Sequence, residues 1–140
     1  MLFRTCAGGV VFYGDSVLLL QNEKNEWVLP KGLVRPGFLA QEVAISRVSA
    51  EAGVQAEILG VAGQTSYEFY SITRQKPVCN EVTWFIMRAA SGKSAPSEAE
   101  GFKDGGFFPM PGALKRVTYS QDRALIASAW ERYQKLQSQR

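Results

Sequence analysis

The chain has 140 residues, of which 46% are hydrophobic, and only two of them are cysteines. This length and composition predict one domain over residues 1–140, with a core that needs no disulfide and no thiolate metal site. Cys6 and Cys79 are therefore expected to be buried, reduced thiols. The absence of histidine excludes imidazole as a base, nucleophile or metal ligand. The net charge of +3 is scattered, which suits a small anionic ligand better than a nucleic acid duplex.

The beginning of the chain carries no targeting signal that we can identify. Met1–Cys6 lacks the basic start and the apolar run of a signal peptide, and no stretch is long enough to span a bilayer. We therefore expect a cytoplasmic protein with no membrane partner.

The first half of the chain predicts a hairpin followed by a helix. Phe3–Phe12 and Val17–Gln21 are rich in β-forming residues and are separated by turn residues. Trp27–Leu29 is expected to be a short strand that ends at a proline. Phe38–Ala52 contains neither glycine nor proline and stops at Gly53, the pattern of a helix closed by a C-terminal glycine.

The second half predicts further strands and a final helix. Strands are expected at Gln55–Gly60, Thr65–Ser71 and Glu81–Arg88, followed by a surface loop at Ser91–Gly106. A short strand at Phe107–Pro109 should lead into a turn of helix, and a long helix should run from Ser120 to Leu136. The order β-β-α-β-β-α predicts an α/β (α+β) fold, in which a mixed β-sheet is sandwiched between helices.

Several segments resemble the Nudix superfamily of hydrolases, in family order. They are Ala7-Gly8-Gly9-Val10-Val11, Trp27-Val28-Leu29-Pro30-Lys31-Gly32, the glycine at Gly53, Ala113-Leu114 and Thr118-Tyr119-Ser120-Gln121-Asp122-Arg123. The segments Leu29-Pro30-Lys31-Gly32 and Trp84-Phe85-Ile86-Met87 are most similar to the branch that cleaves diadenosine polyphosphates. The resemblance implies the Nudix fold and metal-assisted cleavage of a nucleoside diphosphate-linked compound.

The chain departs from the family signature G-x5-E-x7-R-E-U-x-E-E-x-G-U, in which glutamates hold divalent metals. Starting from Gly32, the positions of the first glutamate, the arginine, the next glutamate and the first of the final acidic pair hold Phe38, Ser46, Arg47 and Ala50. Glu51 is retained, together with the glycines and aliphatic residues of the frame. This degenerate motif implies Glu51 as the catalytic and metal-binding carboxylate, with a distal carboxylate chosen from Glu98, Glu100 and Asp104, of which we select Glu100.

The helical periodicity leads to a hypothesis about Arg47. Arg47 and Glu51 fall four residues apart on a stripe that is otherwise apolar, so the two side chains should face the sheet. Two opposite charges on an inward face should pair, because an unpaired buried charge is costly. We therefore expect an Arg47–Glu51 ion pair where a related enzyme would bind Mg²⁺.

The residues expected to contact ligand are Lys31, Gly32, Arg35, Arg47 and Tyr119. Lys31 is the strongest candidate for a phosphate contact. For Arg35 a solubilising surface role is the commoner one, and an aromatic residue on a strand is more often core than ligand platform.

Three functions remain open at this point. The chain is a hydrolase using weakly bound Mg²⁺ or Mn²⁺, or an inactive sensor of a nucleotide or dinucleoside polyphosphate with no metal cofactor, or an interaction scaffold that exposes Phe38. The sequence does not specify the oligomeric state, although an edge strand or Phe38 would allow a homodimer. Because most of the metal-binding glutamates are replaced, we expect phosphoanhydride hydrolysis to be weak or lost.

Overall fold

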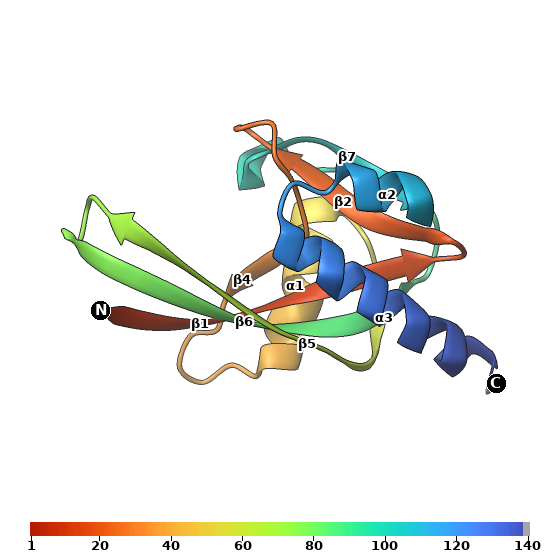
Figure 1. Ribbon diagram of the computed structural model, residues 1–140, viewed down its shortest axis with the longest axis horizontal. Coiled ribbons are helices and arrows are strands. Elements are labelled where there is room, and N and C mark those ends of the chain that lie inside the picture. Colours follow the sequence, from red (N-terminus) through yellow and green to blue (C-terminus); the bar gives the residue numbers. More distant parts are fainter. Residues whose placement is uncertain (139–140) are drawn as a thin grey trace.

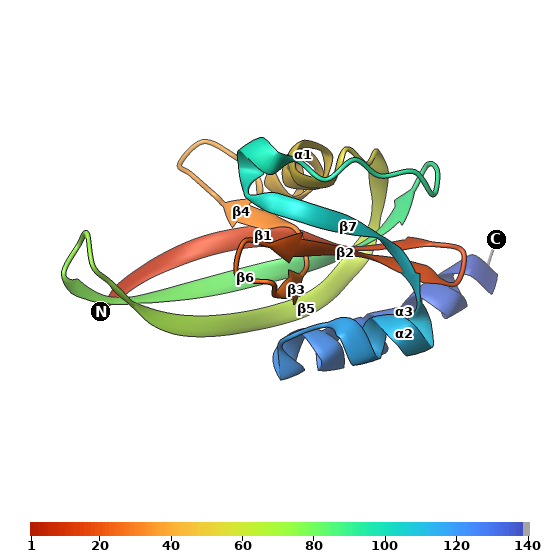
Figure 2. The same cartoon turned by 90° about the horizontal axis from the view of Figure 1, so that it is seen from above.

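The computed structural model describes residues 1–138 and shows a curled mixed sheet between helices, which confirms the predicted fold class. The strands are β1 (Leu2–Tyr13), β2 (Ser16–Asn22), β3 (Trp27–Val28), β4 (Lys31–Leu33), β5 (Ala56–Ser71), β6 (Lys76–Ala89) and β7 (Phe102–Pro109). The helices are α1 (Ala40–Ala52), α2 (Met110–Arg116) and α3 (Ser120–Ser138), with a 3₁₀ turn, η1, at Glu98–Glu100. Figure 1 labels most of these elements, and Figure 2 also labels β3.

Strand β1 is the centre of the sheet. It runs parallel to β6 from Leu2 to Phe12, and β5 continues this side as an antiparallel partner of β6. The other edge of β1 is shared, because β4 pairs with its middle and β2 pairs with its end. Strands β3 and β7 then pair with β2. The sheet therefore divides beside β1, and the β3–β4 connection lies at this division.

The two faces of the sheet are covered by different helices, as Figure 2 shows with α1 on one side and α2 and α3 on the other. Alternate residues of β6 supply the two cores, as the sequence pattern predicts. Trp84 and Ile86 pack in the cluster that contains Tyr133 of α3, whereas Phe85 and Met87 pack in the cluster that contains Val48 of α1. Burial of apolar surface on both faces is what holds the helices to the sheet.

Helix α1 begins two residues later than predicted. Phe38 lies in the preceding loop and is 60% exposed, while the side chain of Glu42 accepts a hydrogen bond from the Leu39 N–H at 3.2 Å and so satisfies one of the free donors at the helix start. The predicted C-terminal glycine is confirmed, since Gly53 has φ 65° and its N–H donates to Ser49 O at 2.9 Å.

Two predictions about the second half of the chain were wrong. The expected loop Ser91–Gly106 contains η1 and the start of β7. The strands expected at Gln55–Gly60 and Thr65–Ser71 form one continuous strand, β5, which is bulged near Gly60 and Gly63. Cys6 and Cys79 are buried and free, as expected. Within residues 1–138 we find no helix that combines the length and apolarity needed to cross a membrane.

Candidate functional site

A cavity of about 740 Å³ opens where the sheet divides. Glu51 of α1 and Asp122 of α3 both line it, although these helices cover opposite faces of the sheet. Its wall combines polar and charged side chains with five aromatic ones, namely Tyr67, Phe69, Trp84, Phe102 and Tyr119. A concave space that offers both apolar surface and polar groups is the usual form of a small-molecule site.

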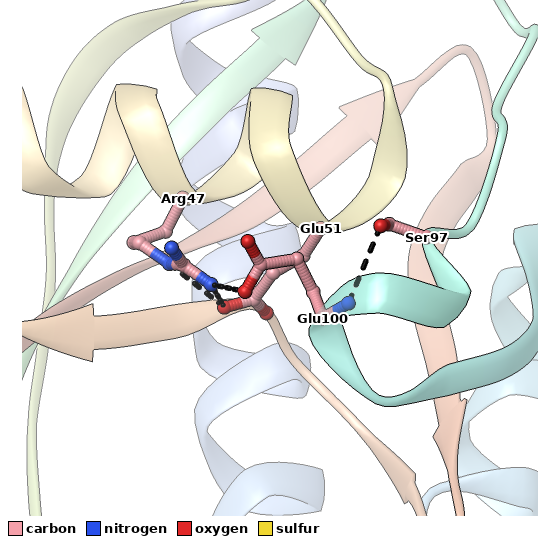
Figure 3. Close-up of polar contacts among 4 residues, drawn as sticks. All are labelled: Arg47, Glu51, Ser97 and Glu100. Atoms are coloured by element: carbon pink, nitrogen blue, oxygen red, sulfur yellow. Dashed lines mark hydrogen bonds and ion pairs between the residues drawn. The ribbon is translucent and has the colours of Figure 1, made fainter.

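Arg47 and Glu51 form the ion pair that the helical spacing predicts. Arg47 donates to Glu51 Oε2 from Nε at 3.0 Å and from Nη2 at 2.9 Å (Figure 3). Glu51 is only 4% exposed. Burial raises the pKa of Glu51, and the hydrogen bonds and charge of Arg47, together with Lys31, oppose that effect. The guanidinium is therefore the main group that keeps a buried carboxylate compensated.

The same guanidinium also binds Glu100, a contact that the sequence did not predict. Nη2 donates to Glu100 Oε2 at 2.8 Å, so one nitrogen bridges carboxylates that lie 49 positions apart in the sequence (Figure 3). Burial alone would lower the pKa of Arg47, but hydrogen bonds to Glu100 and Glu51 leave it raised. Arg47 is thus a fixed cation between the two residues that the sequence analysis selected as metal ligands.

Backbone contacts hold Glu100 in this position. The Ser97 N–H donates to Glu51 O at 2.9 Å, which ties the segment before η1 to the end of α1. The Ser97 hydroxyl then accepts from the Glu100 N–H at 3.3 Å and caps η1 (Figure 3). The contacts among Arg47, Glu51 and Glu100 therefore belong to the packing of η1 against α1.

Gly32 supports Arg47 and does not line the cavity. A Cβ at Gly32 would lie 2.7 Å from both Cγ and Cδ of Arg47, so only glycine leaves room for this side chain. Arg47 itself is absent from the cavity wall, because its charged end is turned to Glu51 and Glu100. Arg35 is exposed in the loop before α1 and also lies outside the wall.

Lys31 and Tyr119 do line the cavity. The Lys31 ammonium lies 5.4 Å from the ring centroid of Tyr67, and no residue from 1 to 138 forms an ion pair with it. The Tyr119 hydroxyl donates to Glu26, and this hydrogen bond raises the pKa of Tyr119 to about 12. The same bond lowers the pKa of Glu26. Lys31 is therefore a cation without a carboxylate partner, whereas Tyr119 is already engaged.

Asp122 and Trp84 are among the residues of the wall that sequence reasoning missed. Trp84 is 2% exposed and donates its indole N–H to Thr65 Oγ1 at 2.8 Å. Burial raises the pKa of Asp122, and Lys31 opposes the shift. An acidic residue in the first turn of a helix is common for capping and dipole reasons, so its type and position gave no signal of a cavity.

The family can be stated from the sequence and the fold together. The NUDIX domain model matches residues 2–128. The chain belongs to the NUDIX domain family. It is 30% identical over 112 residues to a putative mutator protein MutT4 of Mycobacterium tuberculosis, covering 80% of the chain and 44% of that relative. The chain thus spans less than half the length of this curated relative.

Solved structures agree with the NUDIX fold. A NUDIX hydrolase from Nitrosomonas europaea matches with a TM-score of 0.70 at 16% identity, covering 96% of this chain and 74% of that chain. A C. elegans Ap4A hydrolase matches with a TM-score of 0.64 at 21% identity, covering 89% and 93%. The E. coli dihydroneopterin triphosphate pyrophosphohydrolase matches with a TM-score of 0.66 at 16% identity, covering 90% and 95%.

The carboxylates of this Nudix chain do not fit the divalent metal that Nudix hydrolases generally use. Magnesium needs free oxygen ligands in a near-octahedral arrangement. The Oε2 atoms of Glu51 and Glu100 both accept hydrogen bonds from Arg47, whose positive charge would also repel a metal ion. Across the described residues, no three acidic or cysteine side chains come together as a metal-binding group. The donor set is arranged around a guanidinium instead.

Proposed function

We propose that this Nudix protein binds a nucleoside diphosphate-linked compound, a nucleotide or a dinucleoside polyphosphate, and that its phosphoanhydride hydrolysis is weak or lost. The observation that carries the proposal is the position of Arg47, which binds Glu51 and Glu100 at once. Hydrolysis of a phosphoanhydride needs neutralisation of the transferring group and a positioned water, which metals on several carboxylates supply in this family. A guanidinium that occupies those carboxylates removes this route.

Binding of the ligand is supported by the groups that remain available. Lys31 can contact a phosphate as a point charge, and the aromatic wall suits a planar base. The relatives add support, because Ap4A and dihydroneopterin triphosphate, the compounds named for two structural neighbours, both combine a planar ring with phosphates. The protein would then act as a sensor whose ligand binds without a metal.

The direct test is ligand binding in the presence and absence of a chelator. We expect calorimetry to show ADP and diadenosine tetraphosphate binding equally well in EDTA and in Mg²⁺. Lys31→Met should weaken both about ten- to a hundredfold, the effect of losing one hydrogen bond to a charged group. Arg35→Met is the matched control and should change neither, because Arg35 lies outside the cavity. Binding that disappears in EDTA, or turnover that Glu51→Gln abolishes, would show a hydrolase instead.

Restoring the acidic motif provides a second test. In Arg47→Glu/Ala50→Glu the guanidinium is removed and two carboxylates join Glu51 and Glu100. Metal binding to the folded state stabilises it, so 10 mM Mg²⁺ should raise the free energy of unfolding of this variant by about 1.4 kcal/mol if the dissociation constant is about 1 mM. A thermal melt should show this as a higher melting temperature. The control is Ala50→Glu, which adds an exposed carboxylate but keeps Arg47 in place. An equal Mg²⁺ effect on the wild type or the control would contradict the proposed role of Arg47.

A scaffold function is the second candidate, and one observation favours it. Phe38 and Leu39 are adjacent before α1 and are 60% and 62% exposed. Large apolar side chains grouped on a surface are typical of protein contacts. The cavity and the unpaired Lys31 have no role in a pure scaffold, and for that reason we place ligand binding first.

A further inference from the structure

The carboxylates around the cavity differ in whether their hydrogen-bonding capacity is already used. Five of them line it: Glu26, Glu51, Glu68, Glu100 and Asp122. Glu51 and Glu100 bind Arg47, as described above. Glu26 accepts from the Tyr119 hydroxyl on one oxygen and from Asn22 Nδ2 at 3.0 Å on the other. Three of the five are thus occupied by the protein itself.

Of the other two, only Asp122 is shielded from solvent. Glu68 is exposed, whereas Asp122 is half-buried in the first turn of α3. Among residues 1–138 no hydrogen bond to the Asp122 carboxylate is found, although burial makes its charged form costly. A partly desolvated carboxylate that lines a cavity without a hydrogen-bond partner gains most from a ligand that donates hydrogen bonds to it.

Two of the polar donors on the aromatic wall are already used, whereas the Tyr67 hydroxyl accepts from Asn80 Nδ2 at 2.7 Å. The Trp84 indole N–H is given to Thr65, and the Tyr119 hydroxyl is given to Glu26. Trp84 and Tyr119 therefore cannot supply a donor to the edge of a planar ligand. An ionised carboxylate only accepts hydrogen bonds, and it can accept two from neighbouring donors.

We propose that Asp122 determines specificity in this cavity by accepting two hydrogen bonds from a planar ring that carries a ring N–H beside an exocyclic amino group. Guanine and pterin both have this edge. Adenine and cytosine place a bare ring nitrogen beside the amino group, so an ionised Asp122 would face a lone pair. The inference rests on the proposed function and adds which class of ring the bound compound contains.

The experiment compares GDP, IDP and ADP by calorimetry in EDTA. We expect GDP to bind at least tenfold more tightly than ADP, and IDP to lie between them, because hypoxanthine keeps the ring N–H but lacks the amino group. Asp122→Asn should remove the preference for GDP, since an amide presents one donor and one acceptor. Asp122→Ser is a second variant that keeps a residue favourable near a helix start. Glu68→Gln is the matched control and should leave the preference unchanged.

Ligands without phosphates separate this inference from the proposed function. Guanosine and neopterin carry the two candidate rings. If one of them binds, and this binding is lost in Asp122→Asn, that ring is the one that Asp122 recognises. If that binding occurs while no nucleotide binds more tightly than guanosine, the phosphate-binding role of Lys31 fails and the role of Asp122 stands. Equal affinities for GDP and ADP, or a GDP preference that survives in Asp122→Asn, would overturn the role of Asp122 and leave the proposed function intact. Binding of none of these compounds would overturn both.

Discussion

Replacement of Arg47 by methionine should lower the free energy of unfolding by about 2–3 kcal/mol. Removing one partner of a buried ion pair typically costs about 3–5 kcal/mol, because the other charge is left uncompensated. The side chain of Glu51 is 5% exposed but that of Arg47 is 29% exposed, so water recovers part of the loss. Glu100 contributes less, since its side chain is 38% exposed. Urea denaturation at neutral pH, with circular dichroism as the readout, measures the difference.

Two further variants show whether the cost comes from the stranded charge. Arg47→Met/Glu51→Leu removes both charges and should regain most of the lost stability, because an apolar pair of similar volume often replaces a buried ion pair without loss. Arg88→Met is the control for a more exposed pair, because Arg88 binds Glu57, whose side chain is 58% exposed. This substitution should lower the free energy of unfolding by less than about 1 kcal/mol. A double variant as unstable as the sum of its parts would mean that the pair is a packing feature, and the argument from stranded charge would fail.

The sequence predicted those parts of the fold that depend on local patterns. The alternation in Glu81–Arg88 located strand β6, because a strand buried on both faces has apolar residues at every position. The uninterrupted run before Gly53 located helix α1, because a helix commonly ends at a glycine. The Arg47–Glu51 pair was predicted for the same reason. A spacing of four on one helix fixes proximity before any tertiary contact is known.

Features that depend on distant contacts were not predictable in this way. Strand β7 was expected to be mostly loop, because Phe102–Gly106 contains two glycines and two charged residues, yet its backbone pairs with β2 from Asn22 to Ser16. Backbone pairing needs no particular side chain, so a polar, glycine-containing strand at a sheet edge resembles a loop in sequence. The bulged β5 was divided into two strands for the same reason.

The candidate site shows the same limit. Glu100 was selected as a metal ligand because it is acidic and lies in the right part of the chain, and the structure places its carboxylate on Arg47. Asp122 was not selected at all, because its relevance comes from a cavity whose wall is assembled from many strands together with parts of α1, η1 and α3. The residue types were visible in the sequence, but their partners were set by the division of the sheet beside β1.

Substitution of Gly8 by alanine tests that division directly, and we expect it to lower the free energy of unfolding by about 3 kcal/mol, the upper end of the usual cost of overpacking. Gly8 pairs with Lys31 of β4 on one side and with Trp84 of β6 on the other. A Cβ at this position would lie 2.4 Å from Pro30 O and 2.5 Å from Trp84 Cζ3. The first of these atoms belongs to the backbone, so relief requires β4 to move away from β1.

The matched control is Gly106→Ala in β7, where a Cβ would meet only Ser94 Oγ at 3.8 Å, and stability there should change by less than about 1 kcal/mol. Because moving β4 also moves Lys31, Gly8→Ala should weaken ADP binding in EDTA even where the variant remains folded, whereas Gly106→Ala should not. A Gly8→Ala protein with wild-type stability and affinity would mean that β4 yields without cost. The close approach of β1 and β4 would then not be what positions Lys31 over Tyr67, and the phosphate contact would have to be assigned to another cation on the cavity wall, Lys24.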